Sequence, residues 1–209
     1  MVKFLVACGL AALLLVLVYA PAFLIAGGLK LPMNTAVPVI IGITIVAAWA
    51  LAAAYGWWRR LRLADFGVGW ARPRYLVLAL LIAVPLSAAA QLAIERAHES
   101  AAMPGLHLSK AALAFYFLLC APVQEESIFR GLLQTVFTRE LGRTARAAIA
   151  GSIGAALLFA LVHLEIGPVT AAGALLLGLL AGELRRRSGS LLPALLSHVV
   201  FNLPGIFSA

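Results

Sequence analysis

The feature that most constrains this chain is a series of long apolar runs, separated by short segments that hold most of the charged residues. A helix needs about 20 apolar residues to cross the hydrocarbon layer of a membrane, where its backbone polar groups must be satisfied internally. Of the 209 residues, 64% are hydrophobic and only 11% are charged, whereas a soluble domain carries roughly 25% charged residues. The composition excludes a soluble globular domain and predicts an all-α, polytopic transmembrane helical bundle.

The apolar runs predict about seven spans, which together form a single integral membrane domain over residues 1–209. Pro122 lies inside the fourth run, and we expect a break or kink there because proline lacks an N–H. The expected spans are Phe4–Leu29, Met33–Trp58, Tyr75–Ile94, a fourth from about Ala111 to beyond Gln134, Arg146–His163, Val169–Leu184 and Leu191–Phe207.

The basic residues predict the orientation of these spans. The net charge is +8, and because the positive residues lie between apolar runs, we interpret them as membrane-face anchors and expect no nucleic-acid partner. If the N-terminus faces the cytoplasm, every lysine and arginine lies on the inner side except Lys30, Arg96 and Lys110, as the positive-inside rule requires. The Ala/Leu/Arg-rich composition favours a bacterial plasma membrane.

The first run allows a second interpretation. Ala20-Pro21-Ala22 resembles the small-residue cleavage site of a signal peptide. We favour a membrane span, because the apolar run continues past this point and is long enough to cross the bilayer. The orientation of every later span is the same in both cases.

Polar residues inside the spans are the candidates for function, because an intramembrane ionisable group costs about 2.5–3.5 kcal/mol on insertion scales. These exceptions gather in three spans and comprise Glu125, Glu126, Arg130, His163, His198 and Asn202. With a helix rise of about 1.5 Å per residue, the residues apart from Glu126 and Arg130 lie roughly 17–26 Å from the inner-face arginines. Similar depth in three helices predicts one buried, hydrated site in contact with the bilayer.

The spacing of these residues adds detail. His198 and Asn202 are four residues apart, so they share one helix face, and the same spacing predicts an ion pair between Glu126 and Arg130. Glu125 would then point about 100° away, free for chemistry. A single buried histidine is more often a satisfied core residue, and a Glu–Arg pair is often packing. The combination at one depth favours a functional site.

Three motifs resemble those of a known family. Glu125-Glu126-Ser127-Ile128-Phe129-Arg130-Gly131 resembles the EExxxR motif of the CPBP intramembrane proteases, which include CAAX prenyl endopeptidases and bacteriocin-processing (Abi) enzymes. Phe159-Ala160-Leu161-Val162-His163 matches the FxxxH motif, and His198-Val199-Val200-Phe201-Asn202 matches the HxxxN motif. The resemblance covers about residues 111–207, which we expect to form the catalytic core, with peripheral spans in residues 1–110.

The resemblance implies an intramembrane endopeptidase that hydrolyses a peptide bond in a membrane-associated or lipid-anchored protein or peptide. It implies that Glu125 and His163 activate the attacking water. His198 and Asn202 would stabilise the oxyanion, and the supporting residues would be Glu126, Arg130 and Phe159. Such hydrolysis needs a base and donors aimed at the developing charge.

Two questions stay open at this stage. Glu125, His163 and His198 would supply a His₂Glu zinc site, but the chain lacks HExxH, and we favour glutamate-type catalysis without a metal, with zinc as the alternative. The alternative function is a non-enzymatic bacteriocin-immunity or scaffold protein on the same fold. A proton-coupled carrier is less favoured, because the first three spans offer little polar lining.

Overall fold

The computed structural model describes residues 2–99 and 108–208, and this part of the chain is helical throughout, with no strand. The N-terminal half comprises α1 (Val2–Gly28), α2 (Met33–Arg59), the short 3₁₀ helix η1 (Leu63–Phe66) and α3 (Pro73–Ala97). The fourth long helix, Lys110–Leu141, comprises α4 (Lys110–Phe115), η2 (Tyr116–Cys120), α5 (Ala121–Glu125), η3 (Glu126–Leu133) and α6 (Gln134–Leu141). The chain then forms α7 (Ala145–Val162), α8 (Pro168–Ser188) and α9 (Leu192–Ser208).

The helices confirm the predicted fold class. Six of them are long and apolar enough to cross a membrane, and α9 is a seventh, shorter apolar helix. Their ends lie within about one helical turn of the predicted ends. Local signals explain several of these ends, since Ser109 and Thr144 cap the helices that follow them and Gly189 ends α8 in the left-handed conformation. The protein is therefore a multi-pass integral membrane protein.

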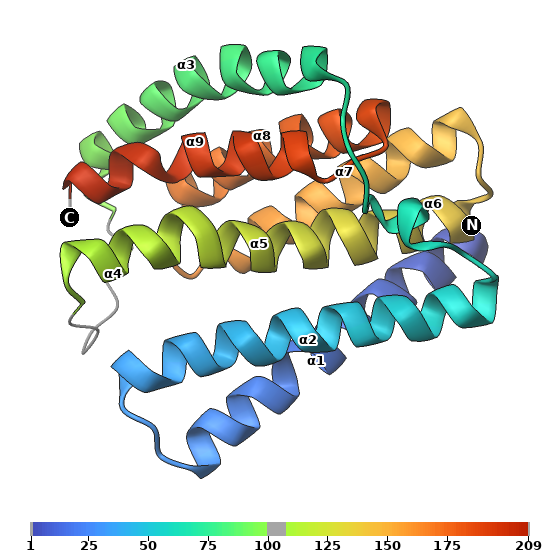
Figure 1. Cartoon of the computed structure of the whole chain (residues 1–209), viewed down its shortest axis with the longest axis horizontal. Helices are drawn as coiled ribbons and strands as arrows, with labels where there is room; N and C mark the ends of the chain where they lie inside the picture. The colour runs from blue at the N-terminus through green and yellow to red at the C-terminus, as the bar shows by residue number, and fades with distance from the viewer. Residues whose placement is uncertain (1, 100–107, 209) are drawn as a thin grey trace.

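Successive long helices run in opposite directions, so the basic segments gather at one end of the bundle, the right-hand end in Figure 1. This end holds the start of α1, the end of α2, the start of α3, the end of α6 and the end of α8. The clustering agrees with the arrangement that the charge pattern predicts. The assignment of this end to the cytoplasm stays a prediction.

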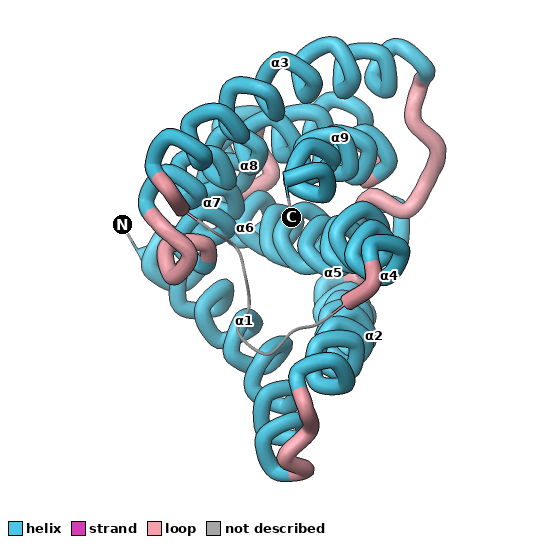
Figure 2. The backbone as a smooth tube through the Cα atoms, turned by 90° about the vertical axis from the view of Figure 1, so that its left-hand side faces the viewer, coloured by secondary structure: helices cyan, strands magenta, loops and turns pink. Residues whose placement is uncertain are grey.

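The fourth long helix lies between two groups of helices. On one side, α2 packs against α5 and η3, and α1 packs against α2 and α6. On the other side, α8 packs against α7 and α9, and α3 covers α8 and α9. Figure 2, which views the helices nearly end-on, shows the α1–α2 hairpin as a separate arm below the other helices. The EExxxR segment is thus held from both sides.

Small residues permit this close packing. A Cβ atom added at Gly178 would lie 3.0 Å from the Cβ of Ala156, and one added at Gly151 would lie 2.6 Å from the hydroxyl of Thr138. Helices in membranes associate through such close contacts, because lipid provides no hydrophobic driving force between them. Gly178 also leaves room for the guanidinium of Arg130, whose Nη2 would lie 3.2 Å from the added atom.

The fourth helix does not break at Pro122. Instead, it contains two π-helical stretches, η2 directly before α5 and η3 directly after it. In η2, the N–H of Ala121 donates to the carbonyl of Tyr116, five residues earlier. The wider π pattern absorbs the missing N–H of Pro122 without a kink, and such stretches are frequent at functional sites.

Candidate active site

The two adjacent glutamates lie where α5 passes into the π-helical segment η3. Glu126 is fully buried, and its Oε1 lies 3.0 Å from Nη1 of Arg130, which is fully buried as well. The spacing of four residues predicted this ion pair. A buried charge is costly unless it is paired, so each member of the pair makes burial of the other tolerable.

His198 of α9 brings the two glutamates together. Its Nδ1 lies 2.8 Å from Oε1 of Glu126, and its Nε2 lies 3.4 Å from Oε2 of Glu125. The imidazole is 3% exposed, whereas the side chain of Glu125 is 20% exposed. The two carboxylates thus contact opposite nitrogens of one imidazole, and Glu125 is the more exposed of the two.

The hydrogen-bond geometry limits where hydrogens can lie on His198 and its two carboxylate neighbours. A carboxylate that accepts from Arg130 can only accept again from His198, so Nδ1 of His198 carries a hydrogen. The contact between Nε2 of His198 and Oε2 of Glu125 is attractive only when one proton lies between them. The side chains thus form a connected chain of polar contacts from Arg130 through Glu126 and His198 to Glu125.

Phe159 of α7 forms an aromatic centre against this chain. Its ring centroid lies 4.6 Å from that of His163, 5.8 Å from that of His198 and 5.0 Å from that of Phe129. The guanidinium carbon of Arg130 lies 4.4 Å from the same centroid. A cation over a desolvated ring is stabilised by the ring quadrupole, so Phe159 braces Arg130 as well as both histidines.

His163 lies directly after the end of α7. Its Nδ1 is 2.7 Å from the carbonyl oxygen of Phe159, and because a carbonyl only accepts, this nitrogen carries the hydrogen and Nε2 is left as an acceptor. None of the ion pairs between described residues joins His163 to a carboxylate. The rings of His163 and His198 thus both contact the ring of Phe159. His163 has no ion pair with Glu125.

Asn202, one turn beyond His198, donates from Nδ2 to the carbonyl of Phe117 at 2.9 Å. The local backbone explains this contact. Ala121 donates to Tyr116 rather than to Phe117, and the next residue in the π pattern, Pro122, has no N–H to donate. Asn202 supplies the missing donor, and the second hydrogen of its carboxamide stays free for another acceptor.

Sequence reasoning missed the contribution of the N-terminal helices to this region. The indole Nε1 of Trp49 in α2 donates to Ser127 at 3.1 Å, and Gln124 donates to the hydroxyl of Thr44 at 2.7 Å. Ser87 of α3 donates to the carbonyl of Phe201 at 2.9 Å. The sequence did contain a sign of these contacts. Isolated polar side chains lie in otherwise apolar spans, and each must find a hydrogen-bond partner inside the bundle.

The candidate zinc ligands do not form a compact set. Glu125 and His198 converge, but Nδ1 of His198 is engaged with Glu126 and His163 stands apart on the other side of Phe159. In residues 2–99 and 108–208, no three His, Cys, Asp or Glu side chains are grouped closely enough to hold a metal ion. The residues present therefore do not fit a His₂Glu site in this arrangement.

The fold and this cluster define a class of protein: a multi-pass membrane protein with carboxylates and an imidazole in contact between its helices. A family model described as "Type II CAAX prenyl endopeptidase Rce1-like" matches residues 107–204. This match, over the C-terminal part of the chain, confirms the family resemblance that the three motifs indicate. The family implies the fold of a CAAX intramembrane endopeptidase in a membrane protein. No curated protein and no solved structure matches the chain.

Proposed function

We propose that this protein is an intramembrane endopeptidase that hydrolyses a peptide bond in a membrane-associated or lipid-anchored protein. The observation that carries the proposal is the placement of Glu125 and Glu126 on the two nitrogens of His198, within a bundle of apolar helices. A structural ion pair needs one carboxylate. The second, partly exposed carboxylate is the group available to a substrate.

In the proposed mechanism, Glu125 is the general base. Glu125 contacts Nε2 of His198, whose Nδ1 is bound to the buried pair of Glu126 and Arg130. A water molecule attacks the scissile carbonyl and gives its proton to Glu125. A carbon–oxygen bond forms, and Glu125 then returns the proton to the amine that leaves as the carbon–nitrogen bond breaks.

The developing oxyanion needs donors that are already in place. Nε2 of His198 becomes one donor when Glu125 takes up the proton of the water and releases this N–H, and the bond from Nδ1 to Glu126 holds the ring in orientation. The free carboxamide hydrogen of Asn202 is the second. His163 contributes the unprotonated Nε2 that accepts from the attacking water, since its Nδ1 is fixed to the Phe159 carbonyl. Glu126, Arg130 and Phe159 are positioning residues.

Cleavage of a lipidated peptide library by the purified full chain in lipid nanodiscs tests this proposal. We expect turnover in the wild type, loss of turnover in Glu125→Ala and His163→Ala, and no effect of a zinc chelator. Glu165→Gln serves as the control, because this exposed carboxylate lies outside the cluster. All variants are first compared by thermal unfolding, so that loss of fold is separated from loss of chemistry.

Three outcomes would contradict parts of the proposal. Turnover that survives Glu125→Ala rejects the base. Loss of turnover with the chelator, restored by zinc, rejects the metal-independent mechanism. Absence of turnover on any peptide in a stably folded wild type favours the non-enzymatic immunity or scaffold function.

A further inference from the structure

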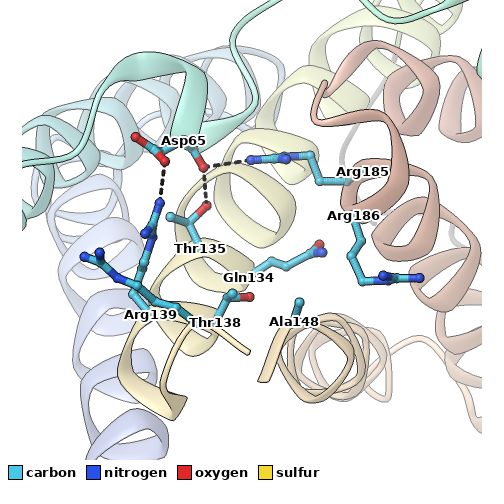
Figure 3. A pocket seen from close by; sticks show the side chains of 9 residues that line it. Asp65, Gln134, Thr135, Thr138, Arg139, Ala148, Arg185 and Arg186 are labelled. Atoms are coloured by element: carbon cyan, nitrogen blue, oxygen red, sulfur yellow. Dashed lines mark hydrogen bonds and ion pairs between the residues drawn. The ribbon is translucent and has the colours of Figure 1, made fainter. Parts of the chain in front are cut away.

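A polar cavity of about 270 Å³ lies at the arginine-rich end of the bundle, distant from the candidate active site (Figure 3). Its walls come from α6, the start of α7, the end of α8 and the η1 segment. Arg139, on one wall, is fourteen residues beyond Glu125, or roughly 20 Å at about 1.5 Å of rise per residue. The proposed proteolysis uses none of the residues that line this cavity.

The cavity carries an excess of positive charge. Four guanidiniums line it, those of Arg139, Arg143, Arg185 and Arg186, together with a single carboxylate, that of Asp65. Asp65 forms an ion pair with Arg139. Arg186 pairs with Glu183, a carboxylate that Arg187 shares. The remaining two arginines of the cavity take part in none of the ion pairs between described residues.

The walls hold these groups in place. Arg185 is 9% exposed and donates from Nη2 to the backbone carbonyl of Asp65 at 2.8 Å, so its charge meets a neutral acceptor rather than the carboxylate. Its Nε has no hydrogen-bond partner in residues 2–99 and 108–208. Gly67, at φ +90°, lies so close to this nitrogen that a Cβ there would collide with it. Donors that are already ordered lower the entropic cost of binding.

Arg143 provides a second guanidinium that lines the cavity and takes part in none of the ion pairs between described residues. It lies in the turn between α6 and α7, at φ +60°, directly after Gly142 at φ +120°. This left-handed conformation is common where a helix ends. Glycine adopts it at a lower cost than a residue with a Cβ.

We propose that this cavity binds a phosphate group, carried either by the headgroup of an anionic lipid or by a free phosphate compound. The guanidinium presents paired N–H donors that match phosphate oxygens, which makes arginine the preferred residue for this ligand. The hydroxyls of Thr135 and Thr138 add short polar groups to the same walls. Basic pockets between membrane helices on the arginine-rich face are the places where anionic headgroups bind.

Thermal unfolding of the purified full chain in neutral detergent tests the proposal, with phosphatidylglycerol in one arm and pyrophosphate in the other. Phosphatidylcholine and sodium chloride at matched ionic strength are the respective controls. At a hundredfold excess over Kd we expect the ligand to raise Tm by about 5 °C. A rise with lipid alone identifies a headgroup as the ligand, and a rise with pyrophosphate alone identifies a free phosphate compound.

Arg143→Gly is the informative variant, because it removes one charge while relaxing the backbone, and it therefore keeps the fold. We expect it to lose most of the Tm increment. Arg146→Ala is the matched control, an exposed arginine three residues away that does not line the cavity, and it keeps the increment. The proposal is overturned by equal increments in the two variants, which indicate general surface charge, or by the absence of any increment in the wild type.

Discussion

The N-terminal helices α1–α3 and the helices from Lys110 onward bury different kinds of side chain. The buried face of α1 is made of small apolar residues such as Ala7, Ala11 and Ala22. The later helices instead bury Glu126, Arg130 and His198 at 3% exposure or less. The N-terminal half packs through close contacts of small apolar side chains, and the C-terminal half packs around buried charged side chains.

This difference shows how a charged cluster is held inside a membrane bundle. A buried ion pair is weak evidence for stability, since desolvation offsets the attraction between the charges. The N-terminal half therefore contributes close packing and single hydrogen bonds, such as Trp49 to Ser127, that fix the helix carrying the glutamates. Under the proposed function, the N-terminal half supports the helix that carries the glutamates and the C-terminal half performs the chemistry. Substitutions in each half test this division.

The largest expected effect is on turnover. Glu125→Gln should lower kcat about 10³-fold, because it removes the proposed base while keeping the size of the side chain. Trp49→Phe removes the indole donor to Ser127 and should lower kcat less than about tenfold. Initial rates at saturating substrate measure both. Equal losses would show that the N-terminal half takes part in the chemistry.

The next effect is on stability. Arg130→Met leaves Glu126 buried without its cation and should lower the free energy of unfolding by about 3–5 kcal/mol. The double variant with Glu126→Gln should regain part of this loss, since the uncompensated charge is gone. Denaturant titration in micelles measures the three proteins. If Arg130→Met alone is as stable as the wild type, the charge of Glu126 is hydrated rather than paired with Arg130.

Asn202 allows a sharper separation of support from chemistry. Asn202→Leu should cost about 1–3 kcal/mol, because the carbonyl of Phe117 loses its donor. Adding Pro122→Ala restores a backbone N–H near that carbonyl and should recover stability. Recovery of stability without recovery of kcat would assign the second carboxamide hydrogen to the oxyanion. Recovery of both would make Asn202 purely structural.

A smaller effect is expected at the contact between the two halves. Thr44→Val and Gln124→Leu each remove one partner of a buried hydrogen bond and should each destabilise the protein by about 1–2 kcal/mol. The double variant should cost less than the sum, because two apolar side chains leave no unsatisfied group. Additive losses in the unfolding free energies would show that the two side chains do not interact.

The smallest effect concerns Glu99, which follows α3 and accepts from the backbone N–H groups of Val169 and Thr170 at the start of α8. Desolvation raises the pKa of Glu99, but these hydrogen bonds outweigh it and hold the pKa below its usual 4.5. A lowered pKa stabilises the fold above the unfolded-state value, and this stability is lost as the pH falls through the folded-state value.

Glu99→Gln should therefore lower Tm slightly at neutral pH, and the difference from the wild type should shrink as the pH falls below about 4.5. Thermal unfolding at a series of pH values measures it, with Glu165→Gln as the control. A difference that is independent of pH would assign the effect to the shape of the side chain rather than to its charge.

Much of the molecule follows from the sequence by itself. The apolar runs determined the helices and their ends, since partition into lipid and helical periodicity depend on neighbouring residues. The spacing of Glu126 and Arg130 determined their ion pair for the same reason. The three motifs determined the family. The helix rise also predicted that Glu125, His163, His198 and Asn202 lie at comparable depth. It did not predict which of these side chains are in contact.

Only the tertiary structure decided which groups meet. Glu125 and Glu126 share one imidazole because α9 packs against α5 and η3. Asn202 donates to the carbonyl of Phe117, which Pro122 of another helix cannot reach with an N–H. The arginine cavity likewise needs the end of α8 beside α6. Such contacts join residues far apart in the chain, and their geometry depends on how whole helices rotate and pack, which no local pattern specifies.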